Sequence, residues 1–341
     1  MIKPYIVVVG ASAGGMEALK KLVAQLPSNF PGSLFIVWHV VPAYPSVLPQ
    51  ILARVCPLPV AHAIDKEAIK LGRIYIAPPD HHLLVESGHV RVTRGPKENR
   101  FRPSIDVLFR SAARSYGKQV IGVVLTGLLD DGASGLYGVK EQGGLAVVQD
   151  PFDALHASMP MQAMKAVAVD HCVPIAEIGA LLVHLTNETV EKEGGHLVPE
   201  QMDIEVKVAR EDNAFESGIM KLGKLSPYTC PECHGMLMQL KEGNMIRFRC
   251  HTGHAYSLNS LLAEVTESIE ASLWKTLRGI EESQMLMSHM AEHLCEADNG
   301  EMAQRFLQKA EQAKRRAGLV RQAVMSHETL SQDKLSHPAK E

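Results

Sequence analysis

The sequence predicts an α/β fold: a doubly wound, mainly parallel sheet with flanking helices, followed by a small cysteine-containing module and a C-terminal helical hairpin. Three features predict it: alternating apolar runs and amphipathic stretches in the first half, a cluster of cysteines and histidines between residues 230 and 254, and long stretches with apolar residues at three- and four-residue steps after it. We expect an α/β domain over residues 1–186, a linker over 187–225, the small module over 226–257, a helical hairpin or coiled coil over 258–327 and a disordered tail over 328–341.

The strands of the first domain are predicted from runs of consecutive apolar residues. Such runs are typical of parallel strands that are covered on both faces. Stretches with apolar residues at helical spacing separate them. Residues 81–94 alternate more loosely, which indicates an antiparallel hairpin at one edge of the sheet. The expected strands are residues 6–9, 34–38, 73–77, 120–125 and 145–148, and the clearest helices are residues 15–26 and 105–116.

Composition excludes several classes of protein. The 35 basic and 38 acidic residues give a net charge of −3, which is not the basic surface of a nucleic-acid binder. No apolar run reaches the roughly 18 residues that cross a bilayer, and the N-terminus does not resemble a signal peptide. We therefore expect a cytoplasmic protein without membrane insertion. Three scattered cysteines, Cys56, Cys172 and Cys295, are interpreted as small apolar residues.

A glycine-rich turn, residues 10–15, lies between the first expected strand and the first helix. One interpretation is a loop that binds the pyrophosphate of a dinucleotide. That fingerprint requires glycine where this chain has Ser12, and an acidic residue about twenty positions later. No acidic residue occurs between Glu17 and Asp65. The pattern instead favours a nucleophile elbow that exposes the Ser12 hydroxyl at the top of the sheet.

A serine nucleophile needs a base and a group that orients the base. His39 follows the second expected strand, and Asp130 and Asp131 follow the fourth. Because the carboxyl ends of parallel strands meet at one edge of the sheet, Ser12, His39 and an aspartate are expected to be neighbours. The order Ser, His, Asp differs from that of α/β-hydrolases. The alternative for each is structural: a chance glycine–serine match, a packed histidine, and a turn that caps the next helix.

Six segments of the first domain match a known family in order along the chain: residues 9–15, 38–40, 74–78, 102–109, 125–132 and 159–160. On these segments, residues 5–186 resemble the catalytic domain of the CheB-type chemotaxis protein-glutamate methylesterases. The resemblance implies that Ser12 is the nucleophile, His39 the base and Asp131, rather than Asp130, the orienting acid. It also suggests the backbone N–H of Ala13 as an oxyanion donor.

The resemblance implies hydrolysis of γ-glutamyl methyl esters on the cytoplasmic helices of chemoreceptors, with no catalytic cofactor. Some members of the family also deamidate receptor glutamines. The acidic loop departs from the family's usual sequence at Leu128, Leu129 and Asp130, which puts substrate preference and rate in doubt. The sequence begins at the catalytic strand, so we expect no receiver domain to regulate the enzyme in cis. Besides the chemoreceptor, the expected partners are a separate response regulator or a second copy of the chain.

The clustered cysteines have the spacing of a metal site. Cys230 and Cys233 form one pair two residues apart, and Cys250 with His254 is the preferred second pair. His251 directly follows Cys250, and His234 directly follows Cys233, so they are weaker candidates. Four ligands predict a closed, structural zinc site in a ribbon-like module. The alternatives are unrelated thiols or a redox pair.

The last part of the chain predicts two long helices separated by Asn299-Gly300. Its apolar stripe, with Trp274 and a methionine patch at residues 285–290, most often means a hairpin that packs on itself. Docking to a receptor or dimerisation is the alternative. A different class of function also remains open: a degenerate esterase domain that acts as a signalling scaffold through its metal module and helices.

Overall fold

The computed structural model describes residues 5–40, 46–188 and 197–330. The chain divides into two compact units, Met1–Leu261 and Leu262–Glu341, which are described separately. The predicted disordered tail lies outside the described residues from residue 331 onward, as does the stretch 189–196 of the predicted linker. The predicted domain boundaries stay predictions.

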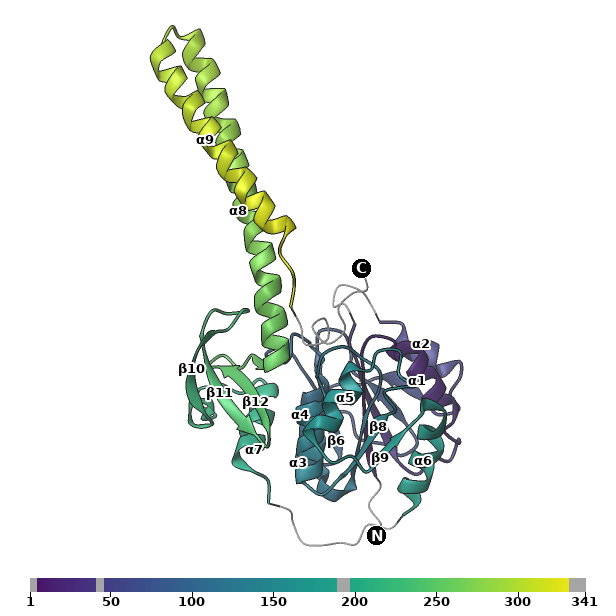
Figure 1. Ribbon diagram of the computed structural model, residues 1–341. Helices are drawn as coiled ribbons and strands as arrows, with labels where there is room; N and C mark the ends of the chain where they lie inside the picture. The colour runs from purple at the N-terminus through teal and green to yellow at the C-terminus, as the bar shows by residue number, and fades with distance from the viewer. Residues whose placement is uncertain (1–4, 41–45, 189–196, 331–341) are drawn as a thin grey trace. The chain divides into compact units, whose positions relative to one another are not determined.

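A parallel seven-stranded sheet forms the centre of the first unit (Figure 1). All its neighbouring strands pair in parallel, which confirms the predicted fold class. The predicted hairpin at residues 81–94 forms, but its strands β5 (His82–Glu86) and β6 (His89–Thr93) make a separate two-stranded sheet, so its predicted place at an edge of the main sheet is wrong. In spatial order the seven strands are β3 (Val60–His62), β4 (Ile74–Ile76), β2 (Ser33–Trp38), β1 (Ile6–Ala11), β7 (Val120–Val124), β8 (Leu145–Gln149) and β9 (His171–Val173).

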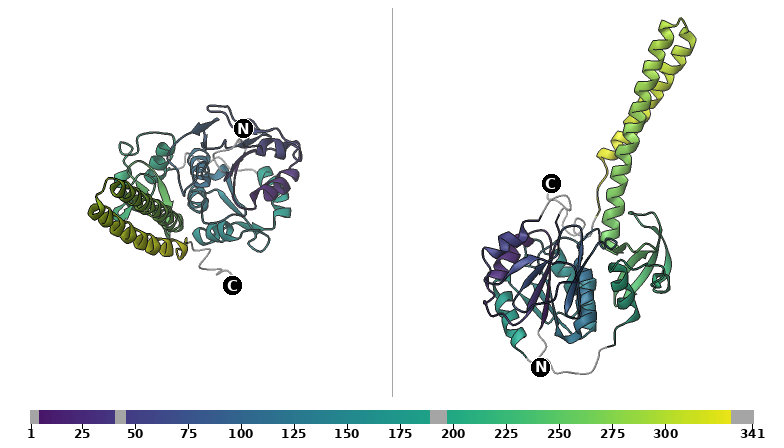
Figure 2. Two further views of the ribbon diagram at one scale, coloured as in Figure 1. Left: turned by 90° about the horizontal axis from the view of Figure 1, so that it is seen from above. Right: turned by 180° about the vertical axis from the view of Figure 1, so that it is seen from behind.

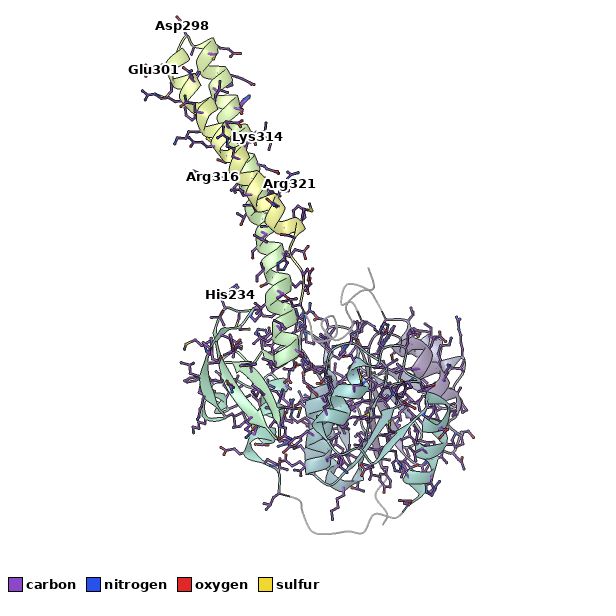
Figure 3. The ribbon with its side chains drawn as sticks, in the orientation of Figure 1. His234, Asp298, Glu301, Lys314, Arg316 and Arg321 are labelled. Carbon is purple, nitrogen blue, oxygen red and sulfur yellow. The ribbon has the colours of Figure 1, made fainter. Side chains whose placement is uncertain are left out.

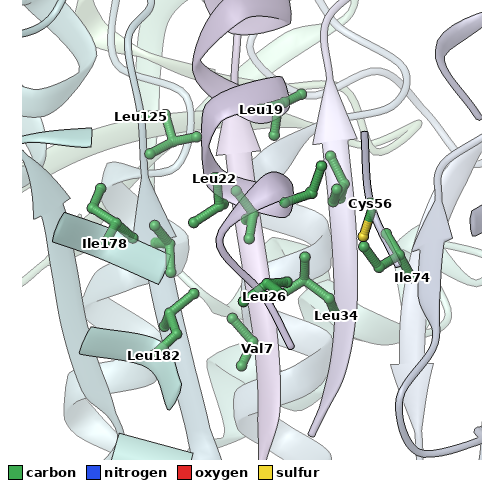
Figure 4. Close-up of a cluster of buried hydrophobic side chains, with 14 of the residues drawn as sticks. Val7, Leu19, Leu22, Leu26, Leu34, Cys56, Ile74, Leu125, Ile178 and Leu182 are labelled. Atoms are coloured by element: carbon green, nitrogen blue, oxygen red, sulfur yellow. The ribbon is translucent and has the colours of Figure 1, made fainter. Parts of the chain in front are cut away.

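Helices cover both faces of this sheet (Figures 1 and 2). Side chains of β1 alternate between the two faces of the sheet and contribute to both hydrophobic cores. Val7 and Val9 pack on one face, and Ile6 and Val8 on the other. Figure 4 shows the first of these two cores. One face is covered by α1 (Gly15–Ala24), α2 (Leu48–Ala53) and α6 (Ile175–Asn187), and the other by α3 (Ile105–Tyr116), α4 (Ala133–Glu141) and α5 (Ser158–Ala166).

The first unit continues beyond the doubly wound domain with a helix and a second sheet. Helix α7 (Glu200–Ala209) lies within the predicted linker and packs against α3. Met202 joins the second core of the main sheet, and Val206 and Ala209 pack with Leu84 and Val107. The second sheet is antiparallel, in the order β10 (Lys224–Thr229), β11 (Met236–Glu242), β12 (Met245–Cys250) and β13 (Ala255–Ser257). We call residues 224–261, which include this sheet, the four-stranded module.

A buried cluster of charged residues joins the four-stranded module to the doubly wound domain. Arg247 and Arg249 on β12 bind two acidic residues, Glu98 in a loop of the first domain and Glu205 on α7. Arg110 on α3 binds the same two carboxylates. All five side chains are at most 2% exposed. Removing either carboxylate would leave three buried arginines with one partner between them, so we expect the cluster to fix the module in place.

The second unit is a helical hairpin. Helix α8 (Leu258–Glu296) starts in the first unit, and α9 (Gly300–Met325) runs beside it (Figure 2). Asn299 caps α9 by accepting the Met302 N–H, close to the tip where Asp298 and Glu301 lie (Figure 3). Small residues line the buried stripe of α9: Ala303, Ala310, Ala313 and Ala317. No helix among the described residues has an apolar stretch that could cross a membrane.

Candidate active site

Three side chains from three neighbouring strands meet at the carboxyl edge of the main sheet. Ser12 follows β1, His39 follows β2 and Asp131 follows β7. His39 Nδ1 lies 3.1 Å from Ser12 Oγ, and His39 Nε2 lies 2.8 Å from Asp131 Oδ2. The structure therefore brings together the three residues that the sequence nominated.

The hydrogen bonds of His39 define its proton positions. The Asp131 carboxylate can only accept, so Nε2 carries the proton and donates it to Oδ2. Nδ1 is then unprotonated and accepts from the Ser12 hydroxyl. The Phe101 ring stacks on the imidazole at a centroid distance of 3.6 Å and an interplanar angle of 7°. This contact fixes the plane in which the imidazole can donate and accept.

The turn at Ser12 is held by its backbone. Ser12 N–H donates to Thr126 O, and Ser12 O accepts from Gly15 N–H and from the Trp38 indole, each at about 3.0 Å. Because the peptide group is planar, fixing Ser12 O also fixes the opposite direction of the Ala13 N–H. Gly14, with φ of 76°, supplies the left-handed residue that ends the turn.

Glycine at position 127 lets the neighbouring loop approach the nucleophile closely. A Cβ there would lie 2.8 Å from Ser12 Cβ and 2.0 Å from Met159 Sδ. Gly127 also forms backbone hydrogen bonds around the start of α5, donating to His156 O before the helix and accepting from Met159 N–H in its first turn. The two segments 125–132 and 159–160 of the sequence motif therefore meet beside Ser12.

Asp131 is fixed at the N-terminus of α3. Its carboxylate accepts the N–H groups of Ile105 at 2.7 Å and Asp106 at 3.3 Å, and the Ser104 hydroxyl at 2.9 Å. Its side chain is only 1% exposed. The unsatisfied N–H groups and the dipole at the start of a helix favour a negative charge in this position.

Two buried carboxylates share this environment and ionise differently. Burial opposes ionisation of Asp131, but hydrogen bonds from His39, Asn99 and the Ile105 N–H together hold its pKa below the usual value. Burial and the neighbouring Asp131 charge raise the pKa of Asp106 well above its usual value. Asp106 accepts from the N–H groups of Gly132 and Gly135 and so caps α4. The arrangement keeps the negative charge on the residue that contacts His39.

Asp130 lies outside this hydrogen-bonded chain. Its carboxylate accepts from Ser257 Oγ at 2.7 Å and from Asn259 Nδ2 at 3.2 Å. The geometry thus distinguishes the two adjacent aspartates, whereas the residue pattern alone did not decide which of them contacts His39.

Sequence reasoning missed four residues around Asp131 and His39: Asn99, Phe101, Ser104 and Asp106. Ser104 and Asp106 lie within the matching segment at residues 102–109. That segment was the one sign in the sequence that could have pointed to them, although it assigns them no role.

Four residues of the four-stranded module could hold a metal ion. The ligand atoms of Cys230, Cys233, Cys250 and His254 all lie within 4.8 Å of one another. Cys250 Sγ lies 3.6 Å from both Cys233 Sγ and His254 Nδ1. Tetrahedral coordination with Zn–S bonds of about 2.3 Å requires sulfur atoms about 3.8 Å apart, so the 3.6 Å between Cys233 and Cys250 fits. These are the four residues that the sequence nominated, and His251 is not among them.

The surroundings favour the thiolate at Cys233 and Cys250, whereas the hydrogen bond with Cys250 and burial raise the pKa of the Cys230 thiol. The hydrogen bond from Cys230 lowers the pKa of Cys250, and the hydrogen bond with Cys250 raises the pKa of His254. Thr252 Oγ1 lies 2.9 Å from Cys250 Sγ and 3.2 Å from Cys233 Sγ, and Tyr256 Oη lies 3.7 Å from Cys230 Sγ. These hydroxyls are placed to donate to metal-bound sulfur.

A doubly wound parallel sheet with serine, histidine and aspartate hydrogen-bonded in series at its carboxyl edge is the arrangement expected of a serine hydrolase. The CheB methylesterase family model matches residues 7–182. The chain belongs to this family.

Several known proteins resemble this part of the chain. A putative protein-glutamate methylesterase/protein-glutamine glutaminase of Leptospira interrogans is 41% identical over 187 residues, which are 54% of this chain and 97% of the relative. Protein-glutamate methylesterase/protein-glutamine glutaminase 5 of Anaeromyxobacter dehalogenans is 43% identical over 184 residues, which are 53% of this chain and 51% of the relative. The crystal structure of the Thermotoga maritima CheB methylesterase catalytic domain matches with a TM-score of 0.52 and 33% identity, over 54% of this chain and all of that structure. The chain thus spans nearly all of some relatives and about half of others.

Proposed function

We propose that this chain is a protein-glutamate methylesterase that hydrolyses γ-glutamyl methyl esters on the cytoplasmic segments of chemoreceptors. The observation that carries the proposal is the continuous hydrogen-bonded chain from Ser12 through His39 to the buried Asp131. A serine hydroxyl becomes an effective nucleophile when a fixed, unprotonated imidazole nitrogen accepts its proton. Membership of the CheB methylesterase family supplies the substrate class. The proposed localisation of the protein is the cytoplasm.

In the first half of the reaction, Ser12 Oγ attacks the ester carbonyl while His39 Nδ1 takes its proton. The Asp131 carboxylate stabilises the imidazolium that forms, because its negative charge faces the Nε2–H. The Ala13 N–H is the proposed donor to the oxyanion, since its direction is fixed by the hydrogen bonds to Ser12 O. His39 then protonates the departing methoxide, which leaves as methanol.

In the second half, water attacks the acyl-enzyme and His39 accepts its proton, then donates that proton to Ser12 Oγ as the bond between Oγ and the acyl carbon breaks. The products are the receptor glutamate and free Ser12. A glutamine side chain gives the same acyl-enzyme, with ammonia as the leaving group, so protein-glutamine glutaminase activity is part of the proposal. Every step uses Ser12, His39, Asp131 and backbone groups, and no catalytic cofactor is needed.

A second part of the proposal concerns the metal. We propose that Cys230, Cys233, Cys250 and His254 hold one structural zinc ion. Three thiolates and an imidazole provide four ligands, which leaves no open position for a substrate. The ion would crosslink the two hairpins of the four-stranded module, which has a small core of its own.

The proposal is tested by labelling with a fluorophosphonate, a probe that reacts with activated serines. We expect an adduct on the peptide that contains Ser12, and about a thousandfold slower labelling in His39→Ala, because the base is lost. The same preparation should release methanol from a methylated receptor fragment. A folded wild-type protein that neither labels at Ser12 nor releases methanol would contradict the proposal and favour the scaffold alternative.

A further inference from the structure

Asn99 links the four-stranded module to the catalytic acid. We infer that Asn99 is a positioning residue through which the module fixes Asp131 and so sets the rate of the chemical step. The inference rests on the proposed role of Asp131 as the acid that orients His39. It gives the four-stranded module a part in catalysis, although the module contributes none of the three reacting side chains.

The amide of Asn99 is satisfied on both sides. Its Nδ2 donates to Asp131 Oδ1 at 3.0 Å and to Asp106 Oδ2 at 2.8 Å. Its Oδ1 accepts the N–H of Ser257 at 2.8 Å and the hydroxyl of Ser260 at 3.1 Å. A carboxylate could not donate and a hydroxyl has one proton, so an amide fits this set of partners.

The module also fixes the backbone of Asn99. Asn99 N–H donates to Ala255 O at 2.8 Å, and Ala255 N–H donates to Lys97 O at 3.2 Å. The segment therefore lies alongside β13 as a short parallel bridge centred on Glu98 and Ala255. Asn99 has a φ of 49°, in the left-handed region that asparagine tolerates better than most residues. This conformation turns the side chain toward Asp131 while the main chain pairs with the module.

The same part of the module holds the loop that carries Asp131 from a second side. Ser257 Oγ and Asn259 Nδ2 donate to Asp130, the residue before the catalytic acid. Ser257 Oγ also accepts the Ser260 N–H at 2.9 Å, which caps the start of α8. The first turn of α8 and the acidic loop are therefore connected through Ser257. Asp130 is thus a contact between the acidic loop and the module.

These contacts predict a specific kinetic effect. The Asn99 side chain contacts the acid and not the reacting atoms, so its loss should lower kcat and leave KM unchanged. A hydrogen bond to a charged group corresponds to roughly a ten- to hundredfold change in rate. Asn99→Ala should therefore lower kcat by about this factor. Ser260→Ala removes one of two donors to Asn99 and should lower kcat by about threefold.

The test is a double-mutant cycle in the full-length chain, with methanol release and Ser12 labelling as readouts. Ser226→Ala is the matched control: Ser226 is a mostly buried serine of the same module, and its Oγ accepts from the Tyr228 N–H. We expect Ser260→Ala to lower kcat in the wild-type background and to have no further effect once Asn99 is alanine. Ser226→Ala should leave kcat unchanged, whatever small loss of stability it causes.

Three results would overturn the inference: an unchanged kcat in Asn99→Ala, effects of Asn99→Ala and Ser260→Ala that multiply independently, or a loss in Ser226→Ala as large as that in Ser260→Ala. Each of these leaves the proposed function standing, because the wild type is active in all of them. A wild type that neither labels nor releases methanol instead overturns the proposed function, and this inference with it. If Asn99→Ala does not fold, the comparison of Ser260→Ala with Ser226→Ala still decides.

Discussion

Arg249 Nη2 donates to Glu98 Oε1 at 2.6 Å, and both side chains are buried although they lie 151 residues apart in the chain. Glu98 directly precedes Asn99, the residue that contacts Asp131. The contact therefore joins two features that the sequence presents separately, an esterase domain and a cysteine-containing module. The stability of variants in the charge cluster therefore measures how strongly this cluster holds the module against the esterase domain.

Glu98→Gln should destabilise the first unit strongly. The substitution leaves Arg110, Arg247 and Arg249 with one carboxylate fewer in a buried site, and breaking a buried ion pair costs about 3–5 kcal/mol. The free energy of unfolding from urea denaturation measures the loss. The control is Glu17→Gln on α1, whose exposed pair with Lys20 should contribute about 0.5 kcal/mol or less. Equal stability of the two variants would contradict a structural role for the cluster.

The same comparison should depend on pH. The three arginines outweigh the burial penalty and lower the pKa of Glu98 below its usual value. A lowered folded-state pKa gives stability that is present above the unfolded pKa of about 4.3 and is lost as pH falls. The difference in unfolding free energy between wild type and Glu98→Gln should therefore be largest near pH 7 and shrink below about pH 4. A difference that grows on acidification would contradict this sign.

Asp131→Asn should lower kcat by about 10³–10⁴-fold at neutral pH, because an amide can hold the imidazole in the wrong tautomer and cannot stabilise its positive charge. Asp130→Asn, at the adjacent residue, is the variant to compare with it. Asp130 lies outside the hydrogen-bonded chain, so its substitution should cost at least about a hundredfold less than Asp131→Asn. Steady-state rates of methanol release measure both. A larger loss in Asp130→Asn would reassign the acid.

Metal removal should unfold the four-stranded module. We expect about one zinc ion per chain by elemental analysis, and almost none in Cys233→Ser. The variant should also melt at a lower temperature, because the module loses the crosslink between its hairpins. Cys172→Ser is the matched control, since Cys172 is exposed and lies outside the four-residue group. Purified wild-type protein that is folded and free of zinc would contradict the assignment.

Much of this molecule could be predicted from local patterns in the sequence. The long central strands are continuous apolar runs, and Ser12 and His39 were found because they end two of them. Strands β3 and β9 could not be predicted in this way, since each has three residues and none is fully buried. The ligand spacing at Cys230 and Cys250 is likewise local. Such features are set by neighbours in the sequence.

Other parts of the site depend on contacts between distant segments. Asn99 lies in a loop without periodicity, and its partners Ser257 and Ser260 are 158 and 161 residues away. Nothing in its neighbourhood in the sequence marks it as functional. The charge cluster could not be predicted either. Glu205 lies in the stretch that was predicted to be a linker, and it becomes buried only when α7 packs on α3. The contacts of Asn99 and of the charge cluster therefore arise from tertiary packing and not from local sequence.

The central claim is that Ser12 is the nucleophile for ester hydrolysis. It is tested most directly by measuring the initial rate of methanol release from a methylated receptor fragment by wild type and by Ser12→Ala side by side. We expect a loss of at least about 10⁴-fold in Ser12→Ala, with circular dichroism and zinc content unchanged. Methanol release by Ser12→Ala at the wild-type rate would contradict it.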